Sequence, residues 1–308
     1  MNYKKILSLT GLIVFIYLLW NIGWLKLIQS FINLNLKILF IALILGVFVL
    51  FMCVKKWFEI LKLQNIYVNY FKLFKISLIG IYYSYITPSK SGGILRSLYL
   101  KDHCNKSLAV CSSSFFIEKI FDILVIVPLA LLGCFFLIDF IQNIYLYLLI
   151  FIICFFLLLY FFYSKKRSKW FFRFFYIHFI PNKLKDKIKE FFDEFYSNLP
   201  PFKKCLKPII FSFLYWIGNY SFAYLIGVAL GLKMSYLIFI SVFPLGTIIG
   251  LLPISIAGLG IRELSLIFFM SKFGINPDII VLTSLISMFF LGIIPAIFGF
   301  FISLRWKK

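Results

Sequence analysis

Residues 252–263, LPISIAGLGIRE, interrupt a long apolar run with Pro253 and two glycines and then place Arg262 beside Glu263. Long apolar segments lie on both sides of these two charges. An ionisable residue at the middle of a bilayer costs about 2.5 to 3.5 kcal/mol on insertion scales. A chain that keeps two of them beside broken backbone is therefore expected to shield them from lipid in a protein cavity.

A second stretch, PSKSGGILR at residues 88–96, has the same order of proline, small residues, a glycine pair and an arginine. Similar apolar lead-ins precede the two prolines, GIYYSYIT before Pro88 and GTIIGLL before Pro253. Two interrupted apolar segments in corresponding halves are typical of transporters built from an inverted repeat. The sequence therefore predicts such a repeat, with the site at its interface.

The composition indicates an integral membrane protein. Of the 308 residues, 63% are hydrophobic and only 14% are charged, which is far more apolar than a soluble domain. The net charge of +21 lies mostly in loops between apolar runs, so lipid headgroups are better partners for it than nucleic acid. The six cysteines form no CxxC pair, and we expect neither a metal site, a disulfide framework nor a cofactor.

The predicted fold is an all-α polytopic membrane protein with about six full transmembrane helices, at residues 6–25, 38–54, 107–138, 146–163, 208–231 and 278–304. Segments 76–100 and 236–273 are each expected to form a re-entrant helical hairpin, because their arms are too short to span, which gives eight spans if each hairpin counts as one. The chain then divides into an N-terminal membrane half (1–163), a linker (164–207) and a C-terminal membrane half (208–308).

The linker is the only long hydrophilic stretch and carries 12 Lys and Arg against 4 acidic residues. Within it, NKLKDKIKEFFDEFY at 182–196 repeats apolar residues near helical spacing, which predicts an amphipathic helix on an anionic membrane surface. Placing the linker and both termini in the cytoplasm puts 24 Lys and Arg inside and 4 outside. That asymmetry predicts a multi-pass protein of the cell membrane with this orientation.

Charged residues also interrupt the apolar run at 107–138. Glu118 and Asp122 are four residues apart and share one face of a helix, with Lys119 adjacent to that face. Flanking aliphatic and aromatic residues favour a position in the same cavity as Arg96. The alternative is a charged patch at a helix end.

PSKSGGILR, the FFIEKIFDIL run that carries Glu118, Lys119 and Asp122, and PISIAGLGIRE together resemble the signatures of a flippase-like membrane family. This family is related to the transmembrane region of lysylphosphatidylglycerol synthases, and the resemblance covers nearly the whole chain. It departs from the family at Gly93 and Ile94, where the family usually has a glutamate. The synthases carry a further aminoacyltransferase domain, so the resemblance implies translocation of a lipid without its synthesis.

The residues give little support for an enzyme. Neither His103 nor His178 has a partner at metal-ligand spacing, and there is no Gly-x-Ser-x-Gly elbow. There is also no G-x4-G-K-[ST] loop, so any transport is expected not to use ATP hydrolysis by this chain. A membrane glycosyl- or acyltransferase is the less favoured alternative.

The resulting hypothesis is a lipid flippase whose two hairpins meet near the membrane midplane and bind an anionic headgroup. Helix starts and glycine backbone in each hairpin would approach the headgroup together with the two arginines. The carboxylates and Lys119 would balance the arginines in the empty site. The expected substrate-binding residues are Gly92, Gly93, Arg96, Glu118, Lys119, Asp122, Gly258, Gly260, Arg262 and Glu263.

Two alternatives stay open at this point. The pairs Arg262 with Glu263 and Arg96 with Glu118 could be ion pairs that only lock the hairpins in place. The same repeat could also serve a small-ion or solute carrier. Besides membrane lipids, a second copy of the chain or a separate lipid-synthesising enzyme are the partners considered.

Overall fold

The computed structural model describes residues 16–17, 19–20, 23–87, 90–141, 146, 149–150, 152–153, 155–157, 160, 164–178, 182–252, 255 and 257–306. Within these ranges the protein is helical and contains no strand. Most of the predicted span 6–25 and half of the predicted span 146–163 lie outside the described residues, as do Pro88 and Pro253.

Within the described residues, four helices are long and apolar enough to cross a membrane. They coincide with the four predicted full spans that fall within the described part of the chain, and they make this an integral membrane protein. The last of them runs from α13 into α14 through a π-helical turn at Phe289–Ile293. The helices are α3 (Leu36–Leu63), α6 (Leu108–Phe136), α10 (Leu206–Ala229), and α13 (Pro277–Met288) with α14 (Ile294–Leu304).

The prediction that the second span ends at residue 54 is wrong, because α3 continues for nine more residues to Leu63. A span that ended at residue 54 would leave Lys55 and Lys56 in the loop that follows it. Lys55 instead forms an i,i+4 ion pair with Glu59 at 3.2 Å, and Lys56 points into the protein with 1% of its surface exposed. Lysine is a good helix former, so two adjacent lysines do not end a helix that continues to bury one face.

Each interrupted segment folds back on itself. In the first, α4 (Tyr70–Tyr85) is followed by the 3-10 helix η1 (Ser91–Leu95), which packs against α4 and leads into α5 (Arg96–Lys101). In the second, α11 (Tyr236–Gly250) packs against α12 (Ile261–Met270). The first arm was expected to begin at 76. It begins at 70 because the side chain of Asn69 caps the helix by accepting from the Phe71 N–H at 2.9 Å.

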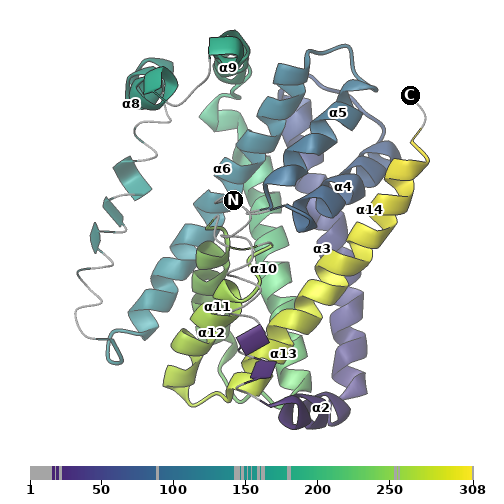
Figure 1. The fold of residues 1–308 in the computed structure, drawn as a ribbon, viewed down its shortest axis with the longest axis vertical. Helices are drawn as coiled ribbons and strands as arrows, with labels where there is room; N and C mark the ends of the chain where they lie inside the picture. Colours follow the sequence, from purple (N-terminus) through teal and green to yellow (C-terminus); the bar gives the residue numbers. More distant parts are fainter. Residues whose placement is uncertain are drawn as a thin grey trace.

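Each interrupted segment also lies along a spanning helix from the other half of the sequence. α4 packs along α14, α11 packs along α6, and α10 packs along α3 in the centre (Figure 1). Glycines allow the first two contacts. A methyl group at Gly299 would overlap the backbone carbonyl of Leu78, and one at Gly133 would overlap that of Ser241. Small residues at such crossings let membrane helices approach closely.

The remaining helices lie at the two ends of the bundle. α8 (Lys165–His178), α9 (Asn182–Ser197) and α5 lie at the top in Figure 1, and α2 (Trp24–Ile32) lies at the bottom. The segment predicted as an amphipathic helix corresponds to α9. Its apolar face contributes Phe191 and Phe195 to a cluster with Ile117 and Phe121 of α6. This contact fastens the linker to a spanning helix.

Candidate functional site

The carboxylates of α6 lie at the centre of a buried ion-pair network. Glu118 and Asp122 are 2% and 3% exposed, and both contact Lys56 of α3, so they share one face as predicted. The Lys56 Nζ lies 2.5 Å from Asp122 Oδ1 and 3.0 Å from Glu118 Oε1. An unpaired charge at this depth would be costly, and this pairing satisfies three charged groups at once.

Arg96, the first residue of α5, joins the same network. Its Nη2 pairs with Glu118 Oε2, and its guanidinium carbon lies 3.8 Å from the centroid of the Trp57 ring. The stem of the arginine crosses α4 at Gly80, where a Cβ would lie 2.8 Å from Arg96 Cδ. Arg96 and Glu118, which were expected to face the same cavity, are thus in direct contact.

Two further donors complete the surroundings of Asp122. The indole N–H of Trp216 in α10 donates to Asp122 Oδ1 at 2.9 Å, and Lys119 Nζ lies 3.3 Å from Asp122 Oδ2. The Lys119 side chain is 47% exposed, so it stands at the rim of the network. Through these contacts the network joins α3, α5, α6 and α10.

The second arginine is paired within its own segment. Arg262 donates from Nε and Nη2 to Glu263 Oε1, at 3.0 and 2.7 Å. Glu263 is fully buried and also accepts from the Ser284 hydroxyl at 2.6 Å and, through Oε2, from the Gly260 N–H at 2.8 Å. The start of α12 is thus capped by a carboxylate of the chain, which complements the positive end of the helix.

The other glycines of the two segments let backbone approach backbone. The Gly92 N–H donates to Thr87 Oγ1 at 2.7 Å, and a side chain at Gly92 would overlap the carbonyl of Tyr83. A Cβ at Gly93 would lie 2.5 Å from Ser84 Oγ. Gly258 has a φ of +83° and lies against the last residue of α11, Gly250. Close packing within the protein therefore accounts for the glycines at these breaks, and no bound ligand is needed to explain them.

Lys90 differs from the other buried cations. It lies at the break of the first segment with a left-handed φ of 55°, and its Nζ stands 5.3 Å from the centroid of the Tyr85 ring. Within the part of the chain that the structure describes, no carboxylate lies within ion-pair distance of it. The charges of Arg262, Lys119 and Glu263 are close enough to act on it, and the two like charges act more strongly than the carboxylate. Lys90 therefore brings the first break into the electrostatic field of the second.

The charged groups of this region sum to a net positive charge. The five cations are Lys56, Lys90, Arg96, Lys119 and Arg262. Glu118, Asp122 and Glu263 balance three of them, which leaves an excess of two positive charges among the described residues.

The sequence motifs had suggested no role for Lys56 or Lys90. Helical spacing could have identified Lys56, because it lies on the same helix face as Val49 and Ile60, which are both buried.

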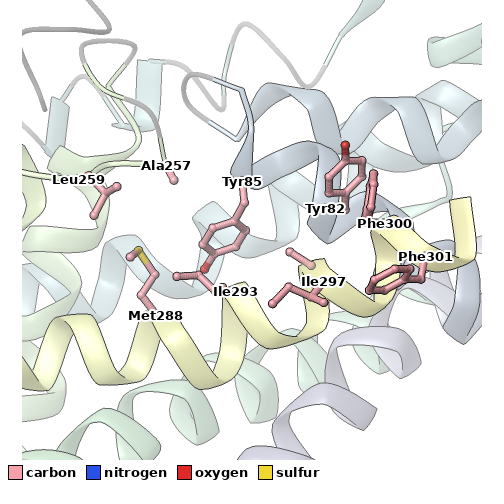
Figure 2. Close-up of a pocket in the computed structure, with 10 residues that line it drawn as sticks. Tyr82, Tyr85, Ala257, Leu259, Met288, Ile293, Ile297, Phe300 and Phe301 are labelled. Carbon is pink, nitrogen blue, oxygen red and sulfur yellow. The ribbon is translucent and has the colours of Figure 1, made fainter. Parts of the chain in front are cut away.

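An apolar groove of about 400 Å³ is lined in part by Tyr85, the residue whose ring lies near the Lys90 ammonium. Figure 2 shows Tyr85 between the loop that precedes α12 and the side chains of α13 and α14. Tyr85 can approach this closely because its hydroxyl end lies against Gly292 in the π-helical turn, where no side chain intervenes. The lining residues are Tyr82, Tyr85, Ala257, Leu259, Met288, Ile293, Ala296, Ile297, Phe300 and Phe301.

The groove is closed on its inner side and open on its outer side. Ala257 and Ala296 are 4% and 7% exposed, whereas Ile297 and Phe301 are 49% and 55% exposed. The open side continues onto other exposed apolar side chains of α14, including Phe298 and Leu304. In a membrane-spanning helix such a face meets the hydrocarbon of the bilayer, so the groove opens sideways toward lipid.

Comparison with known proteins identifies the chain's relatives. The family model described as "Lysylphosphatidylglycerol synthase TM region" matches residues 5–299. A UPF0104 membrane protein of Methanocaldococcus jannaschii is 25% identical over 99% of this chain and 95% of its own length. A second, from Methanothermobacter thermautotrophicus, is 23% identical over 77% of this chain and 76% of its own length. The chain therefore belongs to the lysylphosphatidylglycerol synthase TM region family.

Proposed function

We propose that the protein is a flippase that moves an anionic phospholipid or a lipid-linked anionic headgroup across the cell membrane. The observation that carries this proposal is the juxtaposition of a lipid-facing apolar groove with a group of buried and half-buried charges whose sum is positive. A lipid presents hydrocarbon and an anionic headgroup together, so it matches both surfaces. The family to which the chain belongs is consistent with a lipid-related role.

The proposed machinery is an inverted repeat in which the two interrupted segments enter from opposite sides. Two features support it. The contacts are reciprocal, since α4 packs on α14 while α11 packs on α6, with α3 against α10 between them. Lys and Arg are also distributed unequally between the two sides of the proposed topology. Because Lys56 lies in the interior, the number on the cytoplasmic side falls from 24 to 23, against 4 on the outside. Both termini are accordingly proposed to be cytoplasmic.

A small-ion or solute carrier is the alternative. A water-soluble substrate would not be complementary to a groove that opens sideways between aromatic and aliphatic side chains. The groove therefore favours a lipid substrate. The role is proposed as transport without catalysis, and without ATP hydrolysis by this chain.

The test is reconstitution of the purified protein into phosphatidylcholine vesicles. Fluorescent phosphatidylglycerol and fluorescent phosphatidylcholine with the same acyl chains are compared for dithionite-accessible signal, with uptake of radiolabelled soluble anions measured in parallel. A flippase is supported if phosphatidylglycerol exchanges between the leaflets faster in vesicles that contain the protein than in protein-free vesicles. Uptake of a soluble anion without lipid exchange overturns the proposal in favour of a solute carrier.

A further inference from the structure

Lys90 and the apolar groove are adjacent through one side chain. Tyr85 lines the groove with its ring, and the same ring has the Lys90 ammonium 5.3 Å from its centroid. A molecule whose hydrocarbon lay along α14 in the groove would therefore bring its polar end to Lys90. Of the nearby cations, Arg96 is paired with Glu118 and Arg262 with Glu263, whereas Lys90 has no ion-pair partner among the described residues.

The electrostatics of Lys90 are incomplete without an anion. Arg96 and Arg262 each have a carboxylate partner, and Lys56 has two. Lys90 is half-buried and has no ion-pair partner among the described residues. The like charges of Arg262 and Lys119 act on it more strongly than the opposite charge of Glu263. Like charges repel more strongly where water is scarce, and a bound phosphate would offset this repulsion.

Hydrocarbon gains little by leaving lipid for an apolar groove, because lipid tails are as apolar as the groove itself. The groove can therefore orient a chain, but the choice of lipid must come from the polar end. With a volume of about 400 Å³ it falls in the range of ~300 to 1,000 Å³ found for small-molecule pockets. Selection by charge then rests on Lys90, which has no ion-pair partner in the described part of the chain.

We infer that the groove between α4 and α14 holds one acyl chain of an anionic phospholipid taken from the surrounding bilayer, and that Lys90 is the residue that binds its phosphate and selects against zwitterionic lipids. This inference rests on the proposed function and names the substrate site that it uses. It assigns the selecting role to Lys90 and leaves Arg96 and Arg262 as neutralised members of ion pairs.

The test uses photocrosslinking in detergent micelles. Phosphatidylglycerol and phosphatidylcholine that carry the same diazirine-labelled acyl chain are each added to the full-length protein, and labelled peptides are mapped by mass spectrometry. The expected result is labelling of Ile297, Phe300 or Phe301 by phosphatidylglycerol in excess over phosphatidylcholine. Glycerol 1-phosphate, added as a competitor, distinguishes a lipid site from a free-phosphate site. A lipid site is expected to resist the competitor at millimolar concentration.

Variants test the assignment. Lys90→Gln is expected to lower the preference for phosphatidylglycerol about ten-fold, the effect of losing one hydrogen bond to a charged group. Lys90→Arg is expected to retain it. Lys101→Gln removes an exposed cation from the same segment and is expected to change nothing. Ala296→Phe fills the groove and is expected to abolish labelling by both lipids. Thermal unfolding midpoints are compared to verify that each variant is folded.

Equal labelling of the groove by the two lipids in the wild type would overturn the inference, and so would an unchanged preference in folded Lys90→Gln. Loss of the lipid labelling on addition of glycerol 1-phosphate would show that Lys90 binds a soluble phosphate, and this result would also overturn the inference. The vesicle exchange assay separates this result from the proposed function. Exchange of phosphatidylglycerol that is insensitive to Lys90→Gln would leave the flippase standing without this site. A Lys90-dependent preference in labelling without exchange would leave the site standing in a protein of another function.

Discussion

Lys56 of α3 and Asp122 of α6 form a buried ion pair at 2.5 Å, although 66 positions separate them in the sequence. Next to Lys56 in the chain, Lys55 forms a more exposed pair with Glu59. The two neighbours therefore provide a direct comparison of an interior and a surface cation on the same helix.

Lys56→Met is expected to destabilise the protein strongly, because it leaves Asp122 buried without its main cation. Breaking a buried pair typically costs about 3 to 5 kcal/mol, whereas an exposed pair contributes about 0 to 1 kcal/mol. Lys55→Met, the matched control, should therefore change the thermal midpoint little. Adding Asp122→Asn to Lys56→Met should recover much of the loss. Equal midpoints for the two single variants would mean that Lys56 is not buried as described.

Arg262 and Glu263 allow structure and transport to be separated. Arg262→Gln leaves Glu263 buried with Ser284 and the Gly260 amide as its remaining partners, so the thermal midpoint should fall. Glu263→Gln in addition removes the charge but keeps an acceptor for the Gly260 N–H, so stability should return. Because Glu263 already neutralises Arg262, the stable double variant is expected to retain lipid exchange. Full activity would identify the pair as scaffolding, and stability without activity would identify Arg262 as a ligand of the headgroup.

Gly299→Ala and Gly133→Ala are each expected to destabilise the protein, because the added methyl group overlaps a facing backbone carbonyl that cannot rotate away. Overpacking of this kind costs about 1 to 3 kcal/mol. Gly218→Ala in α10 is the control. Its Cβ would meet only a methyl group of Val49 at 3.0 Å, which can shift, and alanine favours the helix by about 1 kcal/mol. If Gly218→Ala had the lowest thermal midpoint of the three variants, the close backbone contacts at Gly299 and Gly133 would be contradicted.

Orientation can be tested with single cysteines in a variant that lacks the six natural ones. Lys189→Cys in α9 should react with an impermeant maleimide only from the cytoplasmic side, and Lys272→Cys, after α12, only from outside. The basic-residue asymmetry gives this expectation. Labelling of both positions from the same side would rule out the inverted arrangement of the two interrupted segments.

The sequence predicted those features that depend on local pattern. Apolar length located the four spanning helices in the described part of the chain, and helical spacing placed Glu118 and Asp122 on one face. It failed at Lys56, because a lysine pair after an apolar run is typical of a membrane boundary and the partner carboxylates come from a distant helix. The groove was not predictable either. It depends on Tyr85 meeting Gly292 across the two halves of the chain, which no local spacing encodes.

The glycine contacts at Gly299 and Gly133 have a consequence for motion. Each clamps an interrupted segment to a spanning helix from the opposite half of the sequence, with backbone directly against backbone. A rocking movement that separated residues before the linker from residues after it would have to pull both clamps apart. The rigid bodies of any conformational cycle are therefore interlocked pairs, α4 with α14 and α11 with α6. We expect the hinge to lie around α3 and α10, which pack against each other and contact both pairs, and not in the connecting linker.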